Sequence, residues 1–224
     1  MKRVRIKALI SLILSTIVVI SSLYSLSSCG EKNRDYDEAE VLSAAENLIK
    51  KSERLNTIYW GEGIMYSPDL SLANGAYYAA DEESLMLLGV KTVDDIVALT
   101  KETFTEDYAN IIIGTKLSSV SDEDGIKVYA RYYQKYSALD EKPECIMVYK
   151  NAEVFLKDKC EYDYGTLSVE RVKGESIFVK IAVMVTNPDG KSRSTYAEVE
   201  LIEEQNGFRI NNPTYKRYDL GKSE

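Results

Sequence analysis

Histidine, the side chain most often used in catalysis, is absent from this chain. The reactive side chains that stand out instead are cysteines and tyrosines. The 224 residues include 17 tyrosines, three cysteines and no histidine. Without imidazole, Ser-His-Asp and Cys-His catalytic sets and histidine-based zinc sites are excluded. Histidine is also the commonest general acid or base near neutral pH. Two of the cysteines, Cys145 and Cys160, are too few for a zinc or iron–sulfur centre. We predict no metal, no cofactor and no catalytic residue, and therefore a protein that is not an enzyme.

The third cysteine, Cys29, follows a short cationic segment and an apolar run over residues 8–20. The run is short for a bilayer span, and small residues precede the cysteine, as in secretory signals. Leu26-Ser27-Ser28-Cys29 resembles the lipobox of bacterial lipoproteins, with leucine at −3, small residues at −2 and −1, and cysteine at +1. The resemblance implies that Cys29 is acylated, for example by palmitate, and becomes the first residue of the mature chain. The alternative is a signal-anchor helix with an incidental cysteine.

The chain is therefore divided into a signal peptide (1–28), a polar tether (29–36) and one domain (37–224). The formal net charge is −8, and the signal peptide carries only basic charges, so the mature chain is still more acidic. An acidic surface repels phosphate backbones and anionic lipid headgroups. We exclude nucleic acid as a partner and expect the lipid anchor alone to hold the protein on the extracytoplasmic face of the cell membrane.

Tyrosines are concentrated in one stretch that is expected to be a strand, and they occupy both of its faces. A phenol combines an apolar ring with a polar tip, which suits contact with a partner, a glycan or a half-open pocket. Packing is the alternative, because tyrosine also favours half-buried strands. The candidate binding residues here are Tyr129, Tyr132, Tyr133 and Tyr136.

Tyr59 and Trp60 form a second aromatic candidate, at the end of the first expected helix and beside two glycines. Glycines next to an aromatic side chain would let a ligand approach the backbone. The alternative is that both rings seat the helix on the sheet.

Cys145 and Cys160 would lie opposite each other if residues 145–149 and 152–160 formed a hairpin. A disulfide there would contribute about 3 kcal/mol by loop closure. Two reduced, half-buried thiols are the alternative.

Three helical segments are expected before residue 114. The first begins at Asp37, with Glu40 three residues on, and ends near Trp60, since glycines follow. The second begins after Thr92, which caps it with Asp95 at the third position. The third starts at residues 105–107. Residues 61–76 are expected to be a loop, with a short strand at 76–79.

Beyond Gly114 the pattern changes to a period of two residues, which is typical of strands. The longest alternation places Ile177, Val179, Ile181, Val183 and Val185 on one apolar face. Gln205-Asn206-Gly207 predicts a tight hairpin. Expected strands are 126–136, 145–149, 152–156, 164–172, 177–185, 194–203 and 208–210.

Helices followed by consecutive hairpins predict an α+β fold, with N-terminal helices packed on a curved, cone-like antiparallel sheet. This order resembles the nuclear-transport-factor-two-like superfamily, which also includes ketosteroid isomerases. That resemblance implies a pocket between helices and sheet, and an alternative function as an isomerase- or hydratase-like enzyme using Asp/Tyr chemistry. Asp163, between two tyrosines, is the candidate carboxylate for that alternative.

The segment 207–215 and the Tyr-Trp end of the first helix are similar to the DL-endopeptidase inhibitor family of cell-wall proteins. The similarity implies a domain that binds a cell-wall hydrolase and blocks its cleft without catalysis. We therefore predict a non-enzymatic lipoprotein that binds a cell-envelope protein or a small ligand, and the hydrolase inhibitor is its specific version.

Overall fold

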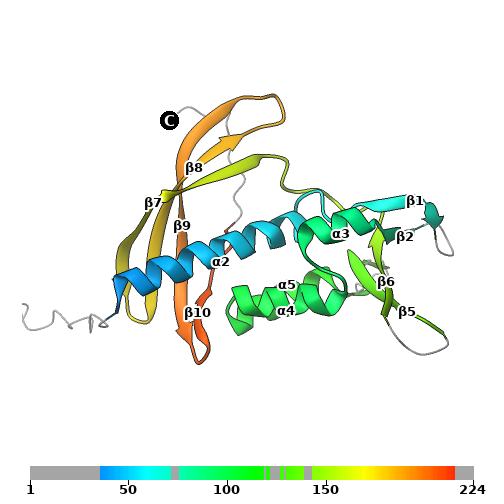
Figure 1. The fold of residues 1–224 in the computed structure, drawn as a ribbon, viewed down its shortest axis with the longest axis horizontal. Coiled ribbons are helices and arrows are strands. Elements are labelled where there is room, and N and C mark those ends of the chain that lie inside the picture. Colours follow the sequence, from blue (N-terminus) through cyan, green and yellow to red (C-terminus); the bar gives the residue numbers. More distant parts are fainter. Residues whose placement is uncertain are drawn as a thin grey trace, which may run out of the picture. The chain divides into compact units, whose positions relative to one another are not determined.

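The computed structural model describes residues 36–71, 76–118, 120–121, 127–128, 130–138 and 143–214. Helices and antiparallel strands are both abundant in this part of the chain, which confirms the predicted α+β class (Figure 1). The elements in chain order are α2 (Glu38–Tyr59), β1 (Tyr66–Ser71), β2 (Tyr77–Ala80), α3 (Glu82–Leu88), α4 (Val93–Thr103), α5 (Glu106–Lys116), β3 (Val120–Ser121), β4 (Lys127–Val128), β5 (Tyr132–Tyr136), β6 (Pro143–Tyr149), β7 (Lys159–Lys173), β8 (Ser176–Thr186), β9 (Ser192–Glu204) and β10 (Gly207–Ile210).

The strands form two four-stranded sheets where one continuous sheet was expected. Their orders are β1-β2-β6-β5 and β10-β9-β8-β7, and β3 pairs with β4 alone. The chain leaves the first sheet after β6, and residues 152–157 form neither helix nor strand. The predicted strand 152–156 is therefore wrong. These residues do not pair as a strand because their hydrogen bonds go elsewhere. The backbone N–H groups of Phe155 and Leu156 both donate to the Trp60 carbonyl, each at 2.8 Å.

The long helix α2 begins and ends close to the predicted positions. The Asp37 carboxylate accepts the N–H groups of Ala39 and Glu40 at 2.9 and 3.4 Å, which caps the first turn. The apolar stripe of the helix is buried against the second sheet, and Figure 1 shows α2 lying across β7–β10. The buried apolar positions of α2 are Val41, Ala45, Leu48, Ile49, Leu55, Ile58 and Tyr59.

The second sheet supplies the other half of this core. The predicted alternation in β8 is confirmed, since the five residues predicted to face inward, from Ile177 to Val185, are each at most 1% exposed. The inward residues of β9 are Ala197, Val199 and Leu201, and all are buried as predicted. The predicted hairpin at 205–207 is also confirmed, because Gly207 pairs with Glu204 and Ile210 with Leu201.

Three local differences from the expectation lie between residues 61 and 136. The expected loop 61–76 contains β1, and the helix α3 was not foreseen. The expected strand 126–136 is interrupted between β4 and β5 at Arg131, whose side chain turns into the protein interior and is 7% exposed. The other helices agree well: the Thr92/Asp95 capping box of α4 is present, and α5 begins at Glu106.

Arg131 and the adjacent Tyr132 bind the C-terminal end of α2, and we call this pair the α2 clasp. The Arg131 guanidinium donates to the carbonyls of Tyr59 (2.9 Å) and Gly61 (2.7 Å) and to the Tyr132 hydroxyl (3.0 Å). The Tyr132 hydroxyl donates to the Ile58 carbonyl at 2.7 Å and accepts the Ile64 N–H at 3.1 Å. The last carbonyls of a helix lack partners within the helix, so the clasp satisfies groups that would otherwise be buried without hydrogen bonds.

Replacing Gly63 should disrupt the α2 clasp. Gly63 has φ +79°, and a Cβ at this position would overlap the Tyr132 hydroxyl and the Arg131 guanidinium. Gly174, with φ +62° and no heavy atom within 4 Å of an added Cβ, is a matched control that carries only the backbone strain. We expect Gly174→Ala to cost about 1–2 kcal/mol of unfolding free energy. Gly63→Ala should cost a further 1–3 kcal/mol, roughly the penalty of overpacking. Urea unfolding followed by the fluorescence of the single tryptophan measures both; equal losses would contradict the clasp.

Candidate functional site

The first aromatic candidate, Tyr59 and Trp60, lies in the core. Tyr59 is 0% and Trp60 7% exposed, and their rings contact edge to face with centroids 5.5 Å apart. The Tyr59 hydroxyl is hydrogen-bonded to Thr100 on α4 at 2.8 Å. The burial of both rings agrees with the alternative that they seat the helix, and it leaves little ring surface for contact with a ligand.

The tyrosines of the second candidate are divided between two sides of β5. Tyr132 is fully buried in the α2 clasp, so it cannot contact a partner. Tyr133 and Tyr136 are 36% and 51% exposed and remain candidates, whereas Tyr129 lies outside the described residues. Tyr133 packs against Tyr77 with centroids 4.8 Å apart, and Tyr77 in turn packs against Tyr149. Aromatic packing thus accounts for part of the tyrosine enrichment.

The two cysteines are free thiols, and the hairpin that would have joined them does not form. Cys145 pairs with Lys135 of β5, whereas Cys160 pairs with Val185 of β8 in the other sheet. Burial raises the pKa of Cys145 and raises that of Cys160 to about 11. Both thiols are therefore protonated at neutral pH, which makes them weak nucleophiles.

A cleft of about 330 Å³ lies between the second half of α2 and the chain entering β7. We call it the α2–β7 cleft. Its volume is at the low end of the range for small-ligand sites, about 300–1,000 Å³. The lining residues are Glu53, Asn56, Thr57, Gly61, Glu62, Leu156, Lys157, Asp158, Lys159, Cys160 and Tyr162.

The α2 clasp positions both walls of this cleft. It fixes the end of α2 on one side, and Arg131 also donates to the Glu153 carbonyl at 3.3 Å. Phe155 and Leu156 are attached to Trp60 through their backbone N–H groups. Segment 153–156 is thereby held against the end of α2, and the following residues 157–160 form the second wall.

Glu53 is the carboxyl group of the helix wall. It accepts the Tyr164 hydroxyl at 2.5 Å, and the Lys50 ammonium lies 4.8 Å from the centre of the Tyr164 ring. Burial raises the pKa of Glu53, an effect partly offset by the Tyr164 hydrogen bond and the Lys50 charge. The pKa of Tyr164 is raised as well, first by burial and then by its bond to Glu53. The pair therefore favours a neutral phenol beside a carboxyl group that binds its proton more tightly than usual.

Asn56 lies three residues further along α2 and has a side-chain atom that forms no hydrogen bond among the described residues. Its side chain is 7% exposed, and its amide nitrogen donates to the Thr214 hydroxyl at 2.9 Å. The amide oxygen is buried and has no hydrogen-bond partner among the described residues. Buried polar atoms are nearly always paired, so this oxygen is an exception among the described residues, and its lack of accessible surface separates it from the open part of the cleft.

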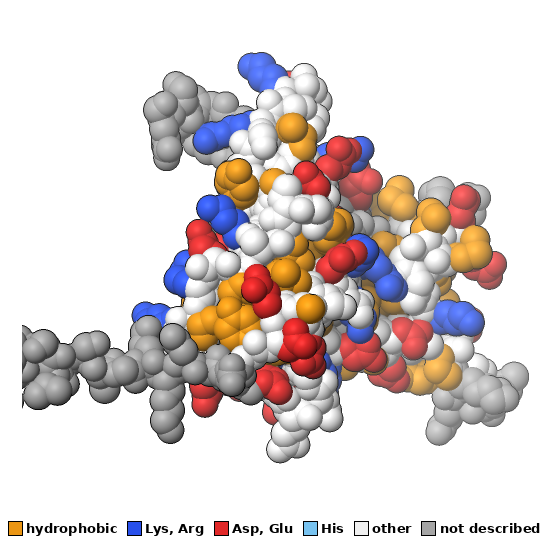
Figure 2. Space-filling model, turned by 60° about the vertical axis from the view of Figure 1, so that its left-hand side comes forward, with side chains coloured by type: hydrophobic (Ala, Val, Ile, Leu, Met, Phe, Trp, Pro, Cys, Tyr) orange, Lys and Arg blue, Asp and Glu red, His pale blue; other side chains and the backbone are white. Residues whose placement is uncertain are grey.

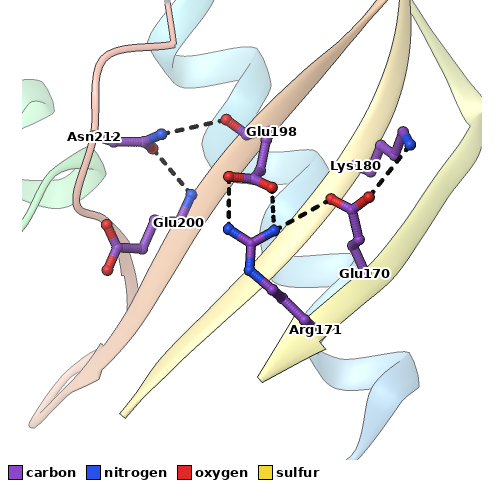
Figure 3. Close-up of polar contacts among 6 residues, drawn as sticks. All are labelled: Glu170, Arg171, Lys180, Glu198, Glu200 and Asn212. Atoms are coloured by element: carbon purple, nitrogen blue, oxygen red, sulfur yellow. Dashed lines mark hydrogen bonds and ion pairs between the residues drawn. The ribbon is translucent and has the colours of Figure 1, made fainter. Parts of the chain in front are cut away.

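The other acidic candidates lie away from this cleft. Asp163 is exposed, and its carboxylate accepts the Gly165 N–H at 3.1 Å within an irregular part of β7. On the solvent face of the second sheet, Arg171 forms a two-point ion pair with Glu198 across β8 (Figure 3). Glu170 pairs with Lys180 at 3.3 Å. The acidic residues of β9 thus contribute to a charged network on the sheet surface.

Acidic and basic side chains are both abundant in the sequence, and both appear on the surface. Figure 2 shows acidic and basic side chains interspersed over one face, with hydrophobic side chains between them. Within the described ranges, no group of three or more Cys, Asp and Glu side chains could hold a metal ion. None of the described helices is both long enough and apolar enough to cross a bilayer.

The sequence contained a signal for Asn56 that the reasoning from motifs missed. Asn56 falls on the apolar stripe of α2, next to Leu55 and four residues before Trp60. A polar residue on a buried stripe needs a partner or a function. Glu53 and Tyr164 carried no such signal, because their contact joins residues 111 positions apart.

No protein-family model, curated protein or solved structure matches this chain.

Stability should depend on pH through Glu53. Its pKa in the folded protein is above the ordinary value of 4.5, so the folded state binds the proton more tightly than the unfolded state. The stabilisation is present at low pH and is lost as pH rises from about 4.5 through the raised pKa. Glu53→Gln stays neutral while still accepting from Tyr164, so the variant should gain stability relative to the native chain over this window. Tyr164→Phe removes the hydrogen bond that favours the charged form of Glu53, so the pKa of Glu53 should rise further. The loss of stability with rising pH should then extend to higher pH.

The measurement is the urea midpoint at several pH values for the native chain and both variants. Parallel curves for the native chain and Glu53→Gln would show that Glu53 does not titrate differently on folding.

Proposed function

We propose that this chain is a bacterial lipoprotein, anchored to the outer face of the cell membrane through Cys29, whose domain binds a ligand without changing it chemically. The cationic segment, the apolar run and the Leu26–Cys29 lipobox support the anchor, and all of them lie outside the described residues. Two acyl chains hold a protein stably on a membrane, whereas one does so only marginally. The tether 29–36 separates that anchor from the domain.

The observation that carries the binding function is the α2–β7 cleft itself, in which Glu53, Asn56 and Cys160 line a hollow of about 330 Å³. A hollow of this size is large enough for a small ligand, at the low end of the usual range. The thiol in the same cleft supports binding rather than covalent chemistry, because the pKa of Cys160 is raised to about 11.

The anchor predicts where the protein is found. In a bacterial host, the native chain should partition into the membrane fraction, and its mature N-terminus should carry acyl chains on Cys29. Cys29→Ser removes the thiol that accepts the lipid. We therefore expect no acylated form of this variant. Mass spectrometry of the N-terminus with fractionation measures this. An unmodified N-terminus on the native chain would remove the proposed location.

The specific version of the function is inhibition of a cell-wall hydrolase, which would use an exposed face of the domain. Tyr133 and Tyr136 are the exposed residues of the tyrosine stretch, and aromatic side chains are enriched in the cores of protein interfaces.

Inhibition is tested by adding the mature chain (29–224) to a DL-endopeptidase acting on peptidoglycan. We expect cleavage to slow at least roughly tenfold at saturation, and the double variant Tyr133→Ala/Tyr136→Ala to lose most of the effect. Tyr196→Ala is the matched control, because Tyr196 is 59% exposed but lies on the solvent face of the second sheet. An unchanged cleavage rate with the native chain would remove the inhibitor version and leave the cleft hypothesis in place.

The second candidate function is the isomerase- or hydratase-like enzyme. The observation that favours it is the Glu53–Tyr164 pair, a carboxyl group of raised pKa bonded to a phenol at the cleft edge. This pair replaces Asp163, which is exposed. Catalysis requires proton transfer to a bound substrate, whereas the binding function requires only a reversible complex.

A further inference from the structure

The short helix α3 presents two large apolar side chains to solvent. Met86 and Leu87 are 76% and 78% exposed, the highest values among the large hydrophobic residues of the described ranges. Leu85 and Leu88, on either side of this pair, are partly buried and pack against the core, so they hold the helix in place. We call the exposed pair the α3 tip. Adjacent apolar side chains that project from a packed support indicate an interaction surface.

The backbone of the α3 tip has partners within the protein. The two N–H groups that follow the helix donate to the carbonyls of Met86 and Leu85, each at 3.1 Å. The Arg54 guanidinium of α2 donates to the Leu88 carbonyl at 2.6 and 3.1 Å. Carbonyls at the end of a helix otherwise bind water, which makes such an end unsuitable for an apolar medium. These three carbonyls need no water, so the tip can leave it at low cost.

The size of the α3 tip favours a lipid surface over a protein partner. A stable protein interface buries about 800 Å² on each side. Two side chains of this size supply only roughly 100–250 Å². Met65 lies beside α3, because its N–H donates to the Ser84 hydroxyl at 3.0 Å, and it is 57% exposed. One more side chain still leaves the area far below that of a stable interface, whereas a bilayer accepts single projecting side chains at its acyl boundary.

Charge along α3 indicates the kind of bilayer. Glu82 and Glu83 occupy the first turn, and residues 85–90 carry no charge. The helix rises roughly 10 Å from end to end, so an inserted tip would leave the two carboxylates at the level of the lipid headgroups. Carboxylates there attract the ammonium of a zwitterionic headgroup and repel an anionic one. The arrangement therefore suits zwitterionic phospholipid.

The proposed lipid anchor brings a bilayer within reach of the α3 tip. Arg54 is the residue of α2 that contacts the end of α3, and α2 rises roughly 26 Å between Asp37 and Arg54. The tether 29–36 can span at most about 26–29 Å. A bilayer that holds Cys29 is therefore accessible to α3 while α2 remains folded.

We propose that the α3 tip inserts into a zwitterionic bilayer and forms a second membrane contact, which fixes the orientation of the domain beside the Cys29 anchor. The inference rests on the proposed anchoring. Charge alone predicts no such contact, because the mature chain is acidic. Insertion of apolar side chains does not require a basic surface.

The first test measures insertion without the anchor. The mature chain (29–224) with Cys29→Ser is floated with phosphatidylcholine vesicles. We expect half-saturation at roughly 1–10 mM lipid, the strength that burial of two apolar side chains supplies. Met86→Ser/Leu87→Ser should weaken partitioning at least roughly tenfold. The control Ile111→Ser/Met184→Ser removes exposed apolar side chains from α5 and the second sheet, and it should change partitioning less than roughly twofold.

Two further measurements belong to this test. Phosphatidylglycerol vesicles should bind the same chain less tightly, because the first turn of α3 is acidic. Tryptophan fluorescence confirms that each variant is folded.

The second test locates the contact in the acylated chain, bound to phosphatidylcholine vesicles whose acyl chains are brominated and quench indole fluorescence. Leu87→Trp places an indole in the α3 tip, and Ile111→Trp places one on α5, which is the matched control. Trp60 is common to both variants and is 7% exposed. We expect the indole introduced at position 87 to lose most of its fluorescence and the one at position 111 to keep it.

Four results would overturn the insertion of the α3 tip. They are no partitioning of the lipid-free chain at up to roughly 50 mM phosphatidylcholine, unchanged partitioning of Met86→Ser/Leu87→Ser, tighter binding to phosphatidylglycerol, and equal quenching at positions 87 and 111. A dimer that forms without lipid and is lost in Met86→Ser/Leu87→Ser would assign the tip to a second copy of the chain and overturn the inference as well.

Failure of the proposed anchor is distinguishable from failure of this inference. An unmodified Cys29 in the native chain would remove the anchor. The partitioning of the lipid-free chain does not use the anchor, so it would still decide whether the α3 tip inserts.

Discussion

The contact on which this domain most depends is the Arg131 guanidinium against the C-terminal end of α2. The last turn of a helix has carbonyls without partners and carries partial negative charge, so a cation with several donors stabilises it. Arg131 supplies those donors to Tyr59 and Gly61 and extends another to Glu153. One buried side chain thereby links the helix that packs on the second sheet to the first sheet, through Tyr132 in β5. The two sheets and the cleft therefore meet at this junction.

Elements whose signal is local were predictable from the sequence. The stripe of α2 and the alternation of β8 both depend on neighbours within a few residues, and each predicted buried set is buried. The division into two sheets was not predictable in this way. It depends on Trp60 accepting the N–H groups of Phe155 and Leu156, nearly a hundred residues away, which prevents residues 152–156 from pairing as a strand. Arg131 interrupts the expected strand 126–136 for a similar reason, because its partners lie at the end of α2.

Residue type alone was a poor guide to the candidate site. Tyr59, Trp60 and Tyr132 have the chemistry of a binding surface, but they are buried at the junction and stabilise it. The residues of the α2–β7 cleft are less conspicuous, since a glutamate and an asparagine on a helix are ordinary surface residues. Only the position of Asn56 on the apolar stripe distinguished it, and the hydrogen bond from Tyr164 to Glu53 required the fold.

Burial acts on the ionisable groups of this region in one direction. It raises the pKa values of Tyr132, Cys160 and Tyr164, and so keeps these groups uncharged at neutral pH. It also raises the pKa of Glu53, where the Tyr164 hydrogen bond and the Lys50 charge act in the opposite direction. The cleft region thus combines a neutral thiol and a neutral phenol with a carboxyl group that binds its proton more tightly than usual, an environment that suits reversible contact better than nucleophilic chemistry.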